Sequence, residues 1–260
     1  MIFKYWKAKN TPSKGTIVFI HGFAITSDYF DSIASKLNEH YDYYALELPG
    51  MGRTEVKNKK DLYPFKFAKM ISEWIKEKEL ENIILIGHSM GGGTVNIIGT
   101  LIPERIQKII SITPMSSVIT SLLMKNSKNI IQYTTKKAYK KANIIAKYAD
   151  LKYPNKENDQ RLIEEVKYNN ENKKNFKILY RHLTSIHSNI MKLYKAEKNI
   201  SVPTLLITTE HDNIIHSKKT AKRLTKNHNV KWVEIKDSGH VPFEEQEKET
   251  LNTILDFLNK

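Results

Sequence analysis

A short apolar run at residues 82–86 ends directly at the pentapeptide GHSMG, residues 87–91, and a helix-compatible stretch follows. This order predicts a buried strand that turns sharply into a helix. A serine on such a turn has its Oγ pushed clear of the sheet, above helix N-terminal N–H groups that favour negative charge. The turn is expected to require glycine at both Gly87 and Gly91, because strand and helix pass too closely there for a Cβ. Ser89 is therefore the candidate nucleophile for acyl transfer.

The C-terminal third of the chain offers a base and an acid for this serine. A serine nucleophile needs a histidine to accept its proton, and the histidine needs a carboxylate that holds its tautomer. An apolar run at 203–209 leads into Asp212, and a second expected strand at 230–235 leads into His240. These two residues are the candidate acid and base. Glu210 is the alternative acid, and its place near the strand end makes it second to Asp212.

The chain order of Ser89, Asp212 and His240 resembles that of the α/β-hydrolase superfamily, in which each triad residue follows a strand in this order. The resemblance covers essentially the whole chain. It implies a mostly parallel sheet with helices on both faces, an inserted helical cap, and the activity of a serine esterase or lipase.

Two further motifs carry the resemblance. One is His-Gly-Phe at 21–23 after an expected strand, and the other is ELPGMGRT at 47–54. At the second of these motifs, the family usually shows Asp-x-Pro-Gly-His-Gly-x-Ser. This chain departs from that pattern at Glu47, Met51 and Thr54, which leaves the turn intact and changes no triad position.

The same geometry predicts an oxyanion hole made of two backbone N–H groups. One belongs to Met90, the residue after the nucleophile, and the other to Phe23 in the loop after the first buried strand. The other histidines near the motifs have structural interpretations. His88 is expected to pack beneath the elbow rather than act as base, and His211 to orient or support the turn that carries Asp212.

Short apolar runs alternate with helical stretches along the chain, which favours a parallel sheet covered by helices on both faces. The expected central strands are 16–20, 43–46, 83–86, 109–113, 205–208 and 231–235. The expected helices are 29–37, 65–78, 91–101, 217–225 and 244–258. Residues before Lys7 are candidates for an antiparallel edge strand. The core is assigned to 1–114 and 199–260, and the helical cap to 115–198.

The expected cap contains no convincing strand and shows helical periodicity. In relatives, an insertion here lies over the serine and shapes the acyl pocket. Apolar cap residues are candidates for a lipophilic lining, although packing of cap on core is the favoured interpretation for any single one. They are Met115, Leu122, Leu123, Met124, Tyr139, Ile186, Met191 and Tyr194.

Positive charge is concentrated in the cap. The chain has a net charge of +14, and residues 115–198 contain 16 Lys and 2 Arg against 7 acidic residues. One helical stretch places Ile131, Ala138, Ala142, Ile145 and Ala149 opposite Lys136, Lys137, Lys140, Lys141 and Lys147. A solvated face is the favoured interpretation, and weak contact with anionic lipid is the alternative. Nucleic-acid binding is not expected, because no recognition motif accompanies the charge.

Composition excludes several kinds of site. The chain has no cysteine, which excludes disulfides, thiolate metal sites and a cysteine nucleophile. It contains no HExxH, Walker or Rossmann motif, so no metal, nucleotide or other cofactor is expected. No signal-peptide h-region or apolar run of membrane-spanning length is present, which predicts a cytoplasmic protein.

The sequence thus predicts a serine hydrolase that cleaves carboxylic esters through an acyl-enzyme on Ser89. Short- to medium-chain esters, monoacylglycerols and lysolipids are the expected substrate classes. A thioesterase or another α/β-hydrolase with the same triad is the first alternative. A non-catalytic binding protein is the second, and the complete triad disfavours it.

Overall fold

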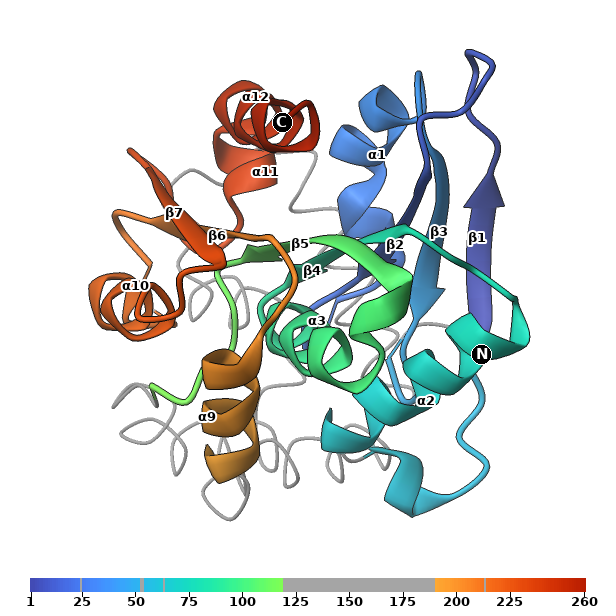
Figure 1. Ribbon diagram of the computed structural model, residues 1–260, viewed down its shortest axis with the longest axis horizontal. Coiled ribbons are helices and arrows are strands. Elements are labelled where there is room, and N and C mark those ends of the chain that lie inside the picture. The colour runs from blue at the N-terminus through green and yellow to red at the C-terminus, as the bar shows by residue number, and fades with distance from the viewer. Residues whose placement is uncertain (24, 52–53, 63, 119–189, 213) are drawn as a thin grey trace, which may run out of the picture.

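A computed structural model describes the chain except for residues 24, 52–53, 63, 119–189 and 213. Its seven described strands form one sheet in the order β1-β3-β2-β4-β5-β6-β7 (Figure 1). The strands are β1 (Ile2–Trp6), β2 (Thr16–Ile20), β3 (Asp42–Glu47), β4 (Ile83–His88), β5 (Ile106–Ile112), β6 (Thr204–Thr209) and β7 (Val230–Ile235). The α-helices are α1 (Asp31–Leu37), α2 (Pro64–Glu77), α3 (Met90–Leu101), α9 (Ile190–Asn199), α10 (Ser217–Leu224), α11 (Pro242–Glu245) and α12 (Glu247–Leu258). The 3₁₀ turns are η1 (Ser27–Phe30), η2 (Lys59–Leu62) and η3 (Pro103–Arg105).

The sheet is parallel from β3 through β7, as the alternating pattern predicts. Strand β1 pairs antiparallel with β3 at the edge, which confirms the expectation for the residues before Lys7. The central strands β4 and β6 are buried along their whole length. Continuous apolar strands of this kind require cover on both faces, and the connecting helices supply it.

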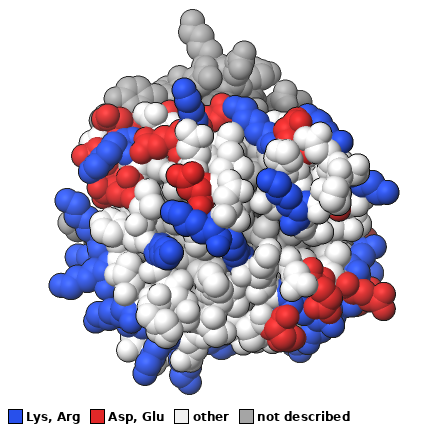
Figure 2. Space-filling model, turned by 45° about the horizontal axis from the view of Figure 1, so that its top comes forward, with Lys and Arg blue, Asp and Glu red and all other residues white. Residues whose placement is uncertain are grey.

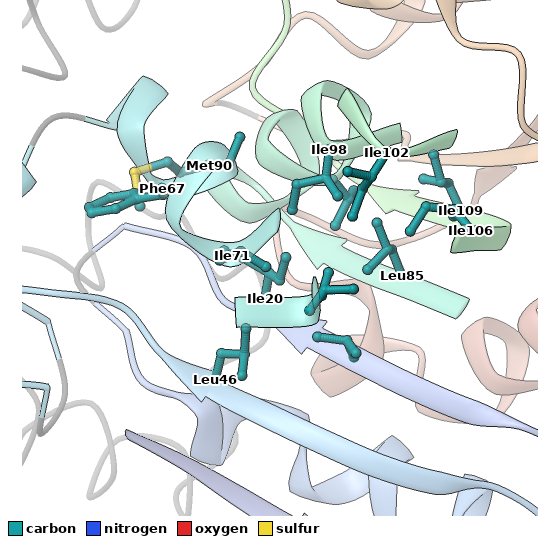
Figure 3. Packing of buried hydrophobic residues seen from close by; sticks show 14 of the residues in the cluster. Ile20, Leu46, Phe67, Ile71, Leu85, Met90, Ile98, Ile102, Ile106 and Ile109 are labelled. Carbon is teal, nitrogen blue, oxygen red and sulfur yellow. The ribbon is translucent and has the colours of Figure 1, made fainter. Parts of the chain in front are cut away.

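Successive residues of β4 point to opposite faces, so the strand contributes to two separate apolar layers. Leu85 belongs to an apolar layer that includes residues of α2, α3, α9 and α10, and Figure 3 shows part of this layer. Ile86 belongs to the layer on the other face, which includes residues of α1, α11 and α12. The two groups of helices lie on opposite sides of the sheet in Figure 1, which confirms the predicted architecture.

Two expected helices differ in detail from the structure. The helix expected at 244–258 is divided into α11 and α12, because the backbone of Gln246 has φ −134° and ψ 57°, outside the helical region. The helix expected at 29–37 is preceded by the 3₁₀ turn η1, where the Thr26 side chain accepts a hydrogen bond from the N–H of Asp28. Both differences arise from local backbone geometry that the apolar period does not encode.

The expected basic face at 131–149 lies outside the described residues, as does most of the expected cap. Helix α9 includes the expected boundary at residue 198 and packs on the core through the buried Leu193. The domain limits remain a prediction.

On the face shown in Figure 2, lysine and arginine side chains are spread among acidic and uncharged ones rather than gathered into one patch. None of the described helices is both long and apolar enough to cross a membrane.

Candidate active site

Ser89 lies on the predicted sharp turn between β4 and α3. Its backbone has φ 53° and ψ −116°, a conformation that L-residues rarely adopt and that costs about 1–3 kcal/mol. Three backbone hydrogen bonds hold it there. The Ser89 N–H donates to the carbonyl of Ile112 at 2.9 Å, and the Ser89 carbonyl accepts from Met115 at 2.7 Å and Gly93 at 3.1 Å. The strained turn is therefore fixed to the end of β5.

The glycines of the elbow are required by close backbone approaches, as predicted. A Cβ on Gly87 would lie 2.6 Å from the carbonyl carbon of Gly91. A Cβ on Gly91 would lie 2.6 Å from the carbonyl oxygen of His21, at the end of β2. Both distances are shorter than any real Cβ contact, so only glycine allows strand and helix to meet here.

His240 and Asp212 are brought together from loops that follow β7 and β6. Nδ1 of His240 lies 2.8 Å from Oδ2 of Asp212, and the Asp212 side chain is fully buried. The other carboxylate oxygen accepts hydrogen bonds from the N–H groups of Ile214 and Ile215, each at 2.8 Å. This carboxylate therefore has a fixed orientation toward the imidazole, as an orienting acid requires.

The alternative acid, Glu210, makes different contacts. Its carboxylate accepts from the N–H of Asp237 at 3.3 Å and lies 3.8 Å from Nε2 of His211. Asp212 rather than Glu210 contacts His240, in agreement with the preferred assignment. His211 lies beside this turn, with its N–H donating to the carbonyl of Ser238 at 2.9 Å.

The loop that carries His240 is tied to the elbow through its backbone. The His240 carbonyl accepts from Nε2 of His88 and from Oγ1 of Thr113, both at 2.9 Å. His88 is the residue before Ser89, and Thr113 follows β5. These two hydrogen bonds hold the base at the same edge of the sheet as the nucleophile.

His88 is buried, as expected for a residue packed inside the elbow. Its ring lies 4.9 Å from that of His240 and 5.1 Å from that of Phe243, centroid to centroid. Burial, together with the neighbouring His240, holds the pKa of His88 well below its usual 6.5. His88 is therefore neutral, with its proton on Nε2, where it donates to the His240 carbonyl.

Glu245 is a site residue that the sequence reasoning missed. Its carboxylate accepts from the N–H of Gly239, from the N–H of Val241 at 3.3 Å and from Oγ of Ser238 at 3.4 Å. It thus binds the backbone on both sides of His240. Burial raises the pKa of Glu245. The only signal in the sequence is a carboxylate five residues beyond the histidine, which is too common a feature to be informative.

The loop expected to complete the oxyanion hole lies against the nucleophile. A Cβ on Gly22 would lie 3.1 Å from Cβ of Ser89 and 3.1 Å from Nδ1 of His88. Phe23 follows directly and is half-buried, and Met90 is buried at the start of α3. Met90 therefore follows Ser89 in the chain, and Phe23 follows the glycine that packs against Ser89.

Among the described residues, one cluster could supply three metal ligands. The ligand atoms of Glu210, His211 and Asp237 lie within 4.8 Å of one another. The two carboxylates are exposed, and the ammonium of Lys236 lies 3.9 Å from Glu210. Exposed acidic groups with a lysine counter-ion do not require a metal, so the site has no assigned cofactor.

Comparisons with known proteins agree with this fold. The family model described as "Serine aminopeptidase, S33" matches residues 11–247. A protein of Mycoplasma pneumoniae named "Putative esterase/lipase 3" is 30% identical over 98% of this chain and 90% of its own length.

Two solved structures share the fold at lower identity. A crystal structure titled as a putative lipase from Acinetobacter baumannii has a TM-score of 0.83 at 20% identity and covers 98% of this chain and 87% of its own. A hydrolase from Oleispira antarctica has a TM-score of 0.79 at 17% identity and covers 99% of this chain and 94% of its own. Taken with the elbow, the strand order and the family match over nearly the whole chain, these similarities show that the chain belongs to the serine aminopeptidase S33 family of the α/β-hydrolase superfamily.

Proposed function

We propose that this α/β-hydrolase cleaves carboxylic esters through an acyl-enzyme on Ser89. The observation that supports this most directly is the buried contact between Asp212 and Nδ1 of His240, 2.8 Å long. The backbone carbonyl of His240 is hydrogen-bonded to the side chain of His88, the residue next to Ser89. A strained serine, an oriented imidazole and a buried carboxylate at one edge of the sheet are the parts that acyl transfer to water needs.

In the proposed mechanism, Oγ of Ser89 attacks the ester carbonyl carbon while Nε2 of His240 takes the hydroxyl proton. Asp212 keeps the imidazole in the correct tautomer and stabilises the imidazolium. The N–H groups of Phe23 and Met90 stabilise the oxyanion, and each such donor contributes about 10²–10³ in kcat. His240 then protonates the leaving alcohol. Water, activated by the same imidazole, hydrolyses the acyl-enzyme and regenerates the serine.

The names of the relatives support esters as the substrate class, because an esterase/lipase and a lipase are among the similar proteins. Short- to medium-chain esters, monoacylglycerols and lysolipids are the proposed substrates within that class. Contact of the basic residues of the expected cap with anionic lipid, and a cytoplasmic location, remain proposals that follow from the sequence alone.

The test is a rate profile of the purified protein over p-nitrophenyl esters from acetate to palmitate, acyl thioesters and aminoacyl p-nitroanilides. We expect esters of short or medium chain to be the best substrates. Ser89→Ala should lower kcat by about 10⁴-fold or more. Full activity of the Ser89→Ala protein would refute the acyl-enzyme. A higher kcat/KM for thioesters or anilides than for esters would instead reassign the substrate class.

A further inference from the structure

We propose that His21 is a positioning residue for the oxyanion hole, which it serves by fixing the tilt of the peptide between Gly22 and Phe23. This inference rests on the proposed function, because it concerns the N–H of Phe23 as an oxyanion donor. His21 contacts no reacting atom in this proposal and acts only through the backbone.

The His21 ring makes two hydrogen bonds of defined polarity. Nδ1 lies 2.8 Å from the carbonyl oxygen of Gly22, and the N–H of Leu48 lies 3.0 Å from Nε2. A backbone N–H can only donate, so Nε2 must carry a lone pair and the proton must be on Nδ1. Nδ1–H therefore donates to Gly22. The ring is fully buried, and burial lowers the pKa of His21 despite the nearby Glu47, which keeps the ring neutral.

The hydrogen bond to Gly22 determines where the next N–H points. Among the described residues the only cis peptide bond is Thr11–Pro12, so the peptide between Gly22 and Phe23 is trans. In a planar trans peptide the C=O and N–H groups point in opposite directions. With its carbonyl directed at His21, this peptide directs the Phe23 N–H to the side away from the imidazole.

The same peptide lies beside the nucleophile. A Cβ on Gly22 would be 3.1 Å from Cβ of Ser89, so the loop after β2 and the elbow are in contact. Rotation of the peptide plane would leave a buried Nδ1–H without an acceptor, at a cost of about 1–3 kcal/mol. The donor is therefore held in place before substrate arrives, which is the condition for strong transition-state stabilisation.

His21 also links the two sequence motifs that flank the site. Nε2 of His21 accepts a hydrogen bond from the N–H of Leu48, which lies in the turn after β3. Within this turn Gly50 has a φ of +79°, and the N–H of Met51 donates to the Leu48 carbonyl at 3.1 Å. The turn at 47–51 thus selects the tautomer that His21 needs in order to donate to Gly22. The turn thus contacts the oxyanion loop through His21, although it contains no proposed triad residue.

Two substitutions each keep one of the two hydrogen bonds. His21→Asn places an amide N–H₂ near the position of Nδ1 and retains the bond to Gly22. His21→Gln places its amide near Nε2 and retains the bond from Leu48. The two variants are similar in polarity and each loses one buried hydrogen bond. They differ in whether the Gly22 carbonyl still has its donor.

The measurements are kcat and KM for a p-nitrophenyl ester and the inhibition constant of a trifluoromethyl ketone, whose hydrate or hemiketal mimics the tetrahedral intermediate. All rates are normalised to active sites titrated with a fluorophosphonate. We expect His21→Gln to lower kcat by about 10²-fold, with KM changed less than about threefold. His21→Asn should keep at least about ten times more kcat than His21→Gln. The affinity for the ketone should fall by the same factor as kcat/KM.

Thr204→Val is the matched control, because it removes a buried hydrogen bond from Oγ1 to the Val202 carbonyl, 2.8 Å long, at the opposite end of β6. Its kcat should equal that of the unaltered protein. The proposal is overturned if His21→Gln keeps the larger kcat of the pair, or if ketone affinity does not change when kcat falls. A Ser89→Ala protein that remains active would refute the proposed function itself. If Ser89→Ala is inactive but both His21 variants keep the kcat of the unaltered protein, only this inference is refuted.

Discussion

Replacing Asp212 by asparagine tests the orientation of the base most sharply, because the structure shows how the amide must turn. One carboxylate oxygen accepts the N–H groups of Ile214 and Ile215, each at 2.8 Å. An amide nitrogen cannot accept these bonds, so the asparagine oxygen must take this position. The amide N–H₂ then occupies the position that contacts Nδ1 of His240.

The amide would reverse the polarity of the contact with the imidazole. Nδ1 would have to accept from the amide, and the imidazole proton would move to Nε2, the nitrogen that must take the proton of Ser89. A base in the wrong tautomer is expected to lower kcat by about 10⁴-fold, which corresponds to about 5.5 kcal/mol of transition-state stabilisation. The fold should persist, because the volume of the side chain is nearly unchanged and the hydrogen bonds from Ile214 and Ile215 are kept.

The assay is the hydrolysis of p-nitrophenyl butyrate over the pH range in which the unaltered protein is active. Asp212→Asn should lose kcat with little change in KM, and its urea unfolding curve should stay close to that of the unaltered protein. Glu210→Gln is the matched control and should keep kcat within about twofold, since Glu210 contacts the backbone of Asp237 rather than His240. An Asp212→Asn enzyme within about tenfold of full activity would refute the assignment of the acid.

Three predictions concern stability, measured by urea unfolding. Gly91→Ala should cost about 3 kcal/mol, since its Cβ would meet the carbonyl oxygen of His21, and unchanged stability would contradict the close approach. Because the pKa of buried His88 is well below 6.5, the unfolded chain takes up a proton at low pH that the folded chain does not. Stability should therefore fall by up to about 1.4 kcal/mol more than in His88→Gln between about pH 7.5 and 5.5, and parallel pH curves would refute this. Glu197→Ala should cost about 3–5 kcal/mol, because it removes the buried carboxylate that lies 3.4 Å from Nε of Arg223 and accepts hydrogen bonds from Ser117; stability within about 1 kcal/mol of the unaltered protein would contradict this.

Much of the core could be predicted because its signals are local. The buried strands are continuous apolar runs, and the pentapeptide at 87–91 specifies both a turn and its chemistry. Asp212 and His240 were predicted from their places after two expected strands and from the triad order that the superfamily resemblance implies. The structure places Nδ1 of His240 2.8 Å from Oδ2 of Asp212.

The parts that sequence reasoning missed depend on hydrogen bonds between side chains and backbone that no sequence pattern marks. Glu245 is the last residue of α11, and its carboxylate accepts a hydrogen bond from the N–H of Gly239, six residues earlier. The tautomer of His21 depends on Leu48, 27 residues away, and no periodicity encodes such a pairing. Among the candidate lining residues, Met115 packs against the core, whereas Met191 and Tyr194 are exposed. The other candidates and the basic face lie among residues 119–189, outside the described structure, and remain predictions.

The most direct test of the account is to locate the covalent adduct that an ester-like inhibitor forms. The protein is treated with a fluorophosphonate, its intact mass is measured, and the labelled peptide is sequenced by tandem mass spectrometry. We expect one adduct per chain, on Ser89, with hydrolysis lost in proportion to labelling. An active enzyme that carries no adduct, or whose adduct lies on another residue while Ser89 is unmodified, would contradict the proposed nucleophile.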